Sequence, residues 1–298
     1  MIHHVIHLSI MTAIFFASTL AGLALYNIIE RGLLRRVERY AGAFLKRLGV
    51  SRRFATPLLL GLASPQAEHA VLSQIYKEKR VEWREIAHYI IATMPLKTLN
   101  FGIRFSYIPA LAALGPAIGS IYIGVDAART FLYLPIAHIF KKIFLKKHAA
   151  EDAETNTTAG VERRRGGYIS LLKSSAYLTL RFALIFTAVE FVFSYISTSF
   201  GLHGGGSHFF NIVITTALMP ATGFFALSTL LHSVGPLKGL AAIFIGRALF
   251  AILFEFPRHS YPFYLTFYPP KIAAKFSLII MILSVATNIL TASVLFCL

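Results

Sequence analysis

Long apolar runs separated by short basic blocks set the pattern of this chain. The runs over 5–29 and 276–298 are longer than the roughly 20 residues that a helix needs to cross a bilayer. The pattern predicts an all-α, multi-pass membrane protein, and a mean hydropathy of +0.65 agrees with it. Further apolar runs, each interrupted by Gly, Pro or a charge, cover about 85–103, 117–140, 175–199 and 239–256. Residues 104–115, with Arg104, Pro109 and Gly115, are expected to form a poorly helical outer connection.

The basic residues predict the orientation of the chain in the cell membrane. The loop 30–53 carries eight Lys and Arg residues, whereas residues 1–29 carry none. By the positive-inside rule, the N-terminus is extracytoplasmic and this loop is cytoplasmic. Apolar positions recur at helical spacing through 30–50, between the basic ones. We therefore expect an amphipathic helix on the inner surface, with anionic lipid as a partner of its basic face.

A second basic block begins at Lys77 and should also be cytoplasmic. The segment 54–76 must then enter and leave the membrane by the same face, yet it is too short for two full spans. A re-entrant helical hairpin satisfies both constraints. Within it, Ser64 and Pro65 form a helix-start signal, because Ser is a good N-cap and Pro suits the first helical position.

A faint repeat relates this hairpin to the segment 209–232. Pro65 and Pro220 are 155 positions apart, and Leu-Ser follows each at the same spacing. The sequence therefore predicts two repeats, 1–147 and 168–298, joined by the polar cytoplasmic linker 148–167. Each repeat has three spans plus a hairpin, and an odd number of spans inverts the second repeat. The alternative is a plain bundle of eight or more spans without symmetry.

The two apolar segments that end at Pro65 and Pro220 resemble those of the Gate domain family, also called nucleoside-recognition domains. The residues that carry the resemblance are 58–65 and 212–220. Such domains occur in bacterial ferrous-iron permeases, spore-maturation proteins and concentrative nucleoside transporters. The resemblance implies a permease-like fold. The cysteines associated with iron passage have no counterpart, since Cys297 lies outside both hairpins.

The hairpin tips are the predicted binding site for a small polar solute or ion. A broken helix leaves backbone N–H groups unpaired, and in lipid these must face protein or a polar cavity. We expect the site at the interface of the two repeats, near the bilayer midplane. In the alternative, each tip is capped by its own side chains. The candidate site residues are Ser64, Pro65, Gln66, Thr215, Thr216, Pro220, Thr222 and the mid-span Glu190.

Other charges inside the apolar runs are expected to pair with each other. Asp126 and Arg129 share a helix face at i, i+3. Arg247 and Glu255 lie two turns apart in a later span, and Arg247 is also a candidate partner for Glu190. Ionisable groups inside spans are functional candidates by default.

Several function classes are disfavoured. The chain lacks the G-x-S-x-G, H-E-x-x-H and P-loop motifs, so no enzyme activity and no cofactor are expected. Its histidines lack acidic or Cys neighbours for a metal site. The net charge of +16 sits in juxtamembrane blocks, which argues against nucleic acid. Transport is the expected function, and a second copy of the chain is a candidate partner. The alternatives are a non-transporting membrane scaffold and a lipid-modifying intramembrane enzyme.

Overall fold

The computed structural model describes residues 35–78, 81–145, 208–218 and 220–298, together with five single positions between 173 and 184. Every element in these ranges is helical and none is a strand, so the predicted all-α class is confirmed for the part of the chain that is described. The expected spans 5–29 and 175–199, the linker 148–167 and Glu190 lie outside the described residues.

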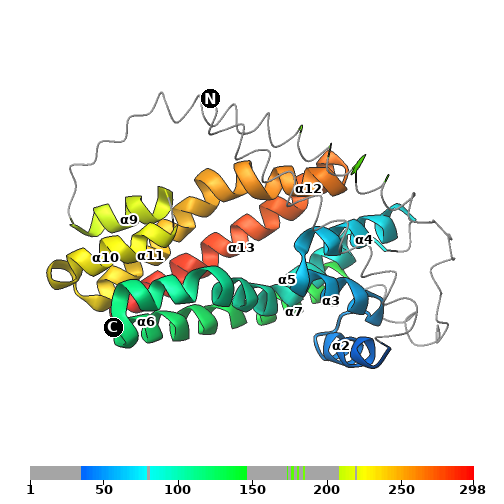
Figure 1. Cartoon of the computed structure of the whole chain (residues 1–298). Coiled ribbons are helices and arrows are strands. Elements are labelled where there is room, and N and C mark those ends of the chain that lie inside the picture. The colour runs from blue at the N-terminus through cyan, green and yellow to red at the C-terminus, as the bar shows by residue number, and fades with distance from the viewer. Residues whose placement is uncertain are drawn as a thin grey trace. The chain divides into compact units, whose positions relative to one another are not determined.

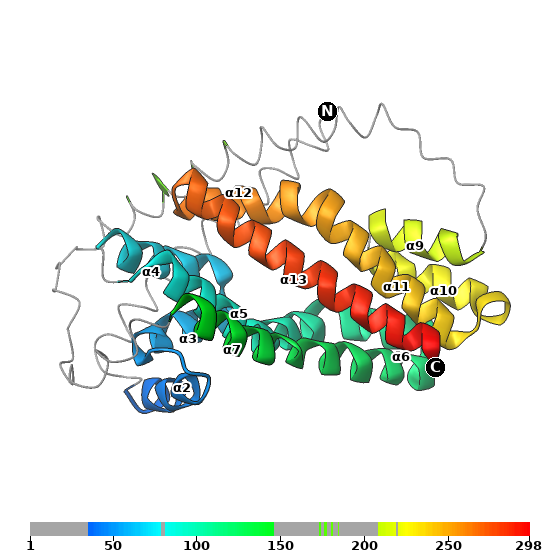
Figure 2. The same ribbon diagram turned by 180° about the vertical axis from the view of Figure 1, so that it is seen from behind.

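The described helices fall into two groups along the chain (Figures 1 and 2). The first group comprises α2 (Arg35–Arg47), the 3₁₀ turn η2 (Arg52–Phe54), α3 (Ala55–Ala63), α4 (Pro65–Lys77), α5 (Trp83–Phe101), the π-helix η3 (Gly102–Ser106), α6 (Tyr107–Phe131) and α7 (Tyr133–Phe144). The second group comprises α9 (His208–Leu218), α10 (Pro220–Val234), α11 (Pro236–Phe250), the π-helix η5 (Ala251–Ser260), α12 (Tyr261–Phe267) and α13 (Pro270–Cys297).

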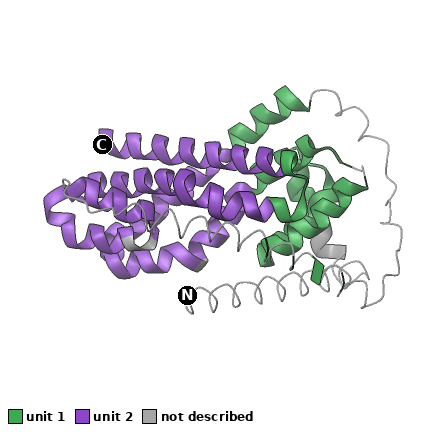
Figure 3. Cartoon of the chain, turned by 90° about the horizontal axis from the view of Figure 1, so that it is seen from above, with its two compact units in different colours: residues 1–93, 134–187, 265–272 green, residues 94–133, 188–264, 273–298 purple. Residues whose placement is uncertain are grey.

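The chain divides into two compact units, drawn in green and purple in Figure 3. Unit 1 takes α2, η2, α3, α4, the start of α5, α7 from position 134, and residues 265–272. Unit 2 takes the end of α5, η3, α6, α9, α10, α11, η5, most of α12 and α13 from Ala273. Both predicted halves of the sequence, 1–147 and 168–298, therefore contribute segments to both units.

In unit 1, α3 and α4 pack against each other as a helical hairpin. Ser64 lies between them with extended backbone angles, φ −150° and ψ 113°, and its Oγ accepts a hydrogen bond from the Ala67 N–H at 3.3 Å. Pro65 is the first residue of α4, so the predicted helix start is confirmed. The helices approach closely at Gly61, where an added Cβ would lie 2.7 Å from Cδ of Glu68. Only glycine leaves room for the Glu68 carboxylate at this crossing.

In unit 2, α9 packs against α10 and α11, and the three helices lie side by side in both ribbon views (Figures 1 and 2). Thr216 of α9 occupies the crossing. An added Cβ at Gly223 of α10 would lie 2.9 Å from Cβ of Thr216. At Gly246 of α11, it would lie 2.6 Å from the carbonyl oxygen of Val213. Glycines on both neighbours thus let α9 lie deep in this unit.

The connection expected at 104–115 is mostly helical, which corrects the prediction. The π-helix η3 leads directly into α6, and the helical backbone breaks only at Gly115, with φ 74° and ψ 171°. Glycine adopts this positive φ without strain, and Pro116 then begins a new helical segment. The two segments of α6 fold back on each other, since an added Cβ at Gly119 would lie 2.9 Å from Cα of Leu111.

Three of the described helical stretches are long and apolar enough to cross a membrane: Tyr107–Phe144, Pro236–Phe267 and Pro270–Cys297. They contain the spans expected at 117–140, 239–256 and 276–298. The span expected near 85–103 forms helix α5, which is not among the three. The orientation of the N-terminus and the total number of crossings stay predictions.

Candidate functional site

The polar groups at the first predicted tip, in unit 1, bond to one another. The Ser64 hydroxyl donates to Oε1 of Gln66 at 3.0 Å, while its oxygen caps α4. Pro65 is exposed. This geometry matches the alternative in which the half-helix is capped by its own side chains.

Two hydroxyl groups at the second predicted tip, in unit 2, donate within their own helix. Thr215 donates to the carbonyl of Asn211 at 2.6 Å, and Thr216 donates to that of Ile212 at 2.7 Å. Thr216 is fully buried at the helix crossing. Pro220 begins α10, and Thr222 also belongs to α10. These hydroxyls satisfy local backbone carbonyls, as Thr residues inside helices commonly do.

Unit 1 also holds a buried polar group one turn beyond the first tip. The Tyr89 hydroxyl donates to Oε1 of Glu68 at 2.6 Å, and Nδ1 of His69 lies 3.1 Å from the hydroxyl of Tyr268. All four residues are buried. None of the four is among the predicted site residues. The available signal was an acid and an imidazole directly after a helix break.

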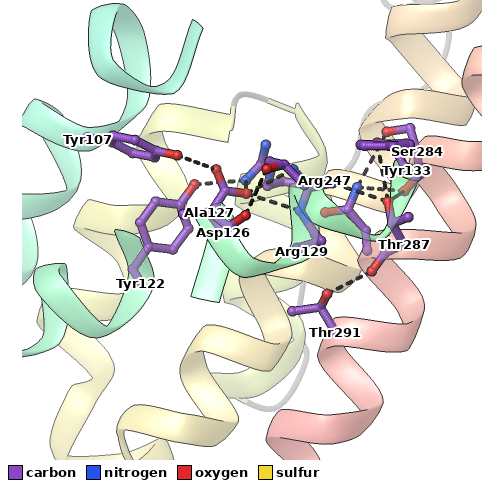
Figure 4. A network of polar contacts seen from close by, with 12 residues as sticks. Tyr107, Tyr122, Asp126, Ala127, Arg129, Tyr133, Arg247, Ser284, Thr287 and Thr291 are labelled. Carbon is purple, nitrogen blue, oxygen red and sulfur yellow. Dashed lines mark hydrogen bonds and ion pairs between the residues drawn. The ribbon is translucent and has the colours of Figure 1, made fainter. Parts of the chain in front are cut away.

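Unit 2 contains a cluster of three charged side chains, which we call the arginine cluster: Asp126 and Arg129 of α6, and Arg247 of α11 (Figure 4). Nη2 and Nε of Arg129 lie 2.9 and 3.1 Å from Oδ1 of Asp126. Nη1 of Arg247 lies 2.8 Å from the same oxygen. The predicted Asp126–Arg129 pair is confirmed, and the third member comes from 121 positions further along the chain.

Aromatic residues complete the cluster. The fold-back of α6 at Gly115 brings Tyr107 to Asp126, whose Oδ2 accepts the phenol hydrogen at 3.3 Å. Nη1 of Arg247 also donates to the hydroxyl of Tyr122 at 2.8 Å. Both guanidinium groups lie near the ring of Phe244, at 5.8 Å for Arg247 and 6.0 Å for Arg129. A ring face at that distance stabilises a cation.

The two guanidinium groups differ in burial and in how many of their nitrogens form hydrogen bonds. Arg129 is almost completely buried and bonds through all three nitrogens, its Nη1 donating to Oγ1 of Thr287 at 3.2 Å. Arg247 bonds only through Nη1, and 19% of its side chain is exposed. No described residue accepts a hydrogen bond from Nε or Nη2 of Arg247. The described residues therefore leave open one edge of this guanidinium, the one that matches a carboxylate bidentately.

The cluster has more positive than negative charge. Two guanidinium groups share the single carboxylate of Asp126, which is 1% exposed. No other ion pair involves these residues in the described part of the chain. The cluster therefore carries a net charge of +1 inside helices apolar enough to span a membrane.

Helix α13 adds a polar stripe beside the cluster. Thr287 accepts from Arg129, and Tyr133 lies 3.3 Å from the same hydroxyl (Figure 4). Asn288 donates to the carbonyl of Ser284 at 2.8 Å, but its own side-chain oxygen is buried without a partner. A buried acceptor of this kind costs free energy unless a donor reaches it, so the stripe has capacity for one more polar contact.

Glu255 stands in the π-helix η5 of the same unit. It lines a small cavity of about 10 Å³ together with Ser260 and Ser284. That volume holds about one water molecule. Burial disfavours the ionised form of Glu255, and the positive charges of Arg247 and Arg129 favour it. No described residue forms an ion pair or hydrogen bond with it. π-Helical turns are frequent at functional sites.

Comparison with protein-family models, with curated proteins and with solved structures finds no match to this chain. The described residues contain no group of three or more potential metal ligands. The site is therefore described by its own chemistry. Of the predicted site residues, the described ones take part in local helix contacts, and the arginine cluster is the stronger candidate.

Proposed function

We propose that this chain is a multi-pass membrane protein that binds a small planar anion at Arg247 and moves it across the membrane. The observation that carries the proposal is the Nε–Nη2 edge of Arg247, to which no described residue bonds, within a cluster whose described residues have a net charge of +1. A carboxylate or another planar oxyanion fits this edge with two parallel hydrogen bonds.

The charge of the cluster favours a bound anion over a purely structural role. A buried charge without a counter-ion in contact with it costs several kcal/mol, even after the protein relaxes around it, and a carboxylate at a distance such as Glu255 offsets only part of that cost. A cluster that only held α6 and α11 together would be more stable with one carboxylate in contact with each guanidinium group. The ring of Phe244 offsets part of the cost, at about 0.5–2 kcal/mol for a cation near an aromatic face. A monoanion offsets the rest.

The order of the helices supports a duplicated architecture. Elements of the first group recur in the second at an offset of 155 positions, and the starts of matched elements agree to within two positions except for the π-helical pair. Pro116 and Pro270 each begin the long final helix of their group, as Pro65 and Pro220 begin the half-helices. The matched elements are α3 and α9, α4 and α10, α5 and α11, η3 and η5, the first segment of α6 and α12, and the remainder of α6 with α7 and α13.

We infer that these matched elements are inverted repeats with re-entrant hairpins. The inference rests on the odd number of spans expected in each repeat and on the basic residues of the loops. Such an arrangement is typical of secondary transporters. The resemblance to Gate domains agrees with it and stays a prediction. A solute site at the interface of the repeats also stays a prediction. The described residues instead favour a site within unit 2.

The binding proposal is tested by thermal unfolding of the purified protein in detergent. Nitrate and acetate are both planar oxyanions and should raise the midpoint temperature, whereas gluconate at equal ionic strength is too bulky and should not. Arg247→Lys keeps the charge but loses the planar fork, so nitrate affinity should fall about tenfold, or about 1.4 kcal/mol. Lys238→Gln removes an exposed charge from the same helix and is the matched control.

Transport is tested separately in proteoliposomes. Nitrate uptake, measured chemically in vesicles recovered by gel filtration, should require wild-type protein and be reduced by Arg247→Lys. Equal responses of wild type and Arg247→Lys to nitrate would rule out the Arg247 site. A protein that binds nitrate without taking it up would be a binding protein. A protein that responds to no anion would favour the scaffold alternative.

A further inference from the structure

We propose that Glu255 is the proton-coupling residue of the arginine cluster, so that each bound anion is accompanied by one proton taken up on the Glu255 carboxylate. The inference rests on the proposed anion site and adds the identity of the coupling ion. It comes from the charge balance of unit 2 and from the geometry of η5.

Among the described residues, the charges of the empty cluster balance only if Glu255 is included. Arg129 and Arg247 are positive and Asp126 is negative, which leaves one positive charge. Glu255 forms no ion pair with any described residue, and we take it as the missing negative charge. Burial disfavours a charge on its carboxyl group, whereas the positive charges of Arg247 and Arg129 favour it. Glu255 therefore acts as a counter-ion at a distance, through a medium in which charges interact more strongly than in water.

A bound monoanion upsets this balance. The site then holds one negative charge in excess, which is unfavourable in a low-dielectric environment. A proton on one of the two carboxyl groups restores neutrality. Asp126 is the poorer acceptor, because its Oδ1 accepts three N–H hydrogen bonds from the two guanidinium groups and these favour the ionised form. Glu255 has no such bonds, so the proton goes to a carboxyl oxygen of Glu255.

The surroundings of Glu255 allow the proton to reach it. The small cavity beside it is lined by two hydroxyl groups, those of Ser260 and Ser284. The amide nitrogen of Asn288 lies 3.4 Å from Oγ of Ser284, and the amide oxygen of Asn288 is the buried acceptor without a partner. One water molecule in this cavity would connect the Glu255 carboxyl to the hydroxyl of Ser284 and so to the polar stripe of α13.

The elements around Glu255 carry few other titratable groups. On η5 itself they are Arg258 and His259, and on α11 they are Lys238 and Arg247. Arginine and lysine are already protonated at neutral pH, so His259 is the competing site. The titratable residues of α6 are Tyr107, Tyr122, Asp126 and Arg129, and those of α13 are Lys271, Lys275 and Cys297. The tyrosines are neutral acids at pH 7 and accept no proton.

The test measures proton uptake when nitrate binds to the purified full-length protein in weakly buffered detergent, with a pH-indicator dye. Nitrate does not titrate near neutral pH, so any proton that disappears from solution is taken up by the protein. On the order of one proton per bound nitrate is expected for wild type. Glu255→Gln should still bind nitrate and take up none. His259→Gln, the matched control on the same element, should behave as wild type.

Difference infrared spectroscopy keeps the test independent of the variant's folding. In wild-type protein, nitrate should produce the carbonyl band of a protonated carboxyl group. Nitrate binding with neither proton uptake nor this band overturns the coupling inference and leaves the anion site standing. Loss of uptake in His259→Gln assigns the proton to His259 and also overturns it. Wild-type protein that binds no nitrate refutes the anion site, and the coupling inference with it.

Discussion

Asp126→Asn is the sharpest test of the arginine cluster, because among the described residues Asp126 carries the only negative charge in contact with the two guanidinium groups. The side chain keeps its size and one oxygen. Breaking a buried ion pair by removing one partner costs about 3–5 kcal/mol, since the other charge is left uncompensated. We therefore expect a loss of stability in that range in the absence of added anion.

The same substitution should have the opposite effect on anion binding. The net charge of the cluster rises from +1 to +2, so nitrate should bind more tightly and recover part of the lost stability. We expect at least about a tenfold gain in nitrate affinity, which corresponds to about 1.4 kcal/mol. A structural ion pair without a ligand site would show the loss of stability and no such gain.

Unfolding in SDS, followed by the fluorescence of the single Trp83, measures both effects with and without nitrate. The second variant is Asp126→Asn with Arg129→Gln, which returns the net charge to +1. The loss of stability in this double variant should be smaller than the sum of the two single losses by about 0.5–3 kcal/mol, as for residues in one network. Additive effects, or a loss below about 1 kcal/mol for Asp126→Asn, would contradict a buried coupled cluster.

Three further predictions concern the hairpins and the topology. Gly61→Ala and Gly223→Ala each place a Cβ against a packed side chain and should cost about 1–3 kcal/mol in thermal stability, whereas Gly124→Ala meets open space and should be neutral or stabilising. Ser64→Ala removes an N-cap and should lower stability by about 1 kcal/mol with nitrate binding unchanged. A loss of nitrate binding would show that the first hairpin tip contributes to the anion site. Lys79→Cys in a Cys297→Ser background should resist membrane-impermeant reagents applied from outside, and external labelling would exclude the re-entrant interpretation of the first hairpin.

Local chemistry explains the features that were predictable from the sequence. The helix start at Pro65 follows from an N-cap serine and a proline without an N–H, and both effects act within one turn. The pairing of Asp126 with Arg129 follows from helical periodicity alone. The three apolar stretches that are long enough to span a membrane are equally local properties.

The expected break at 104–115 shows where such reasoning fails. The sequence predicts a poorly helical connection that contains Arg104, Pro109 and Gly115, but of these three residues only Gly115 adopts a non-helical backbone. The preceding π-helical turn and the packing of the two α6 segments maintain the helix across the other positions. Tertiary contacts of this kind commonly override a local preference.

The tertiary structure alone decided which charges and hydroxyls meet. The sequence indicated that charges buried in apolar runs need partners, because an isolated charge is costly there. It contained no signal that Arg247 shares an oxygen of Asp126, or that Tyr89 reaches Glu68. Nor did it indicate that Thr216 is enclosed by Gly223 and Gly246. Such contacts depend on how helices far apart in the chain pack together, and helix packing follows side-chain shape over many residues, which no local pattern encodes.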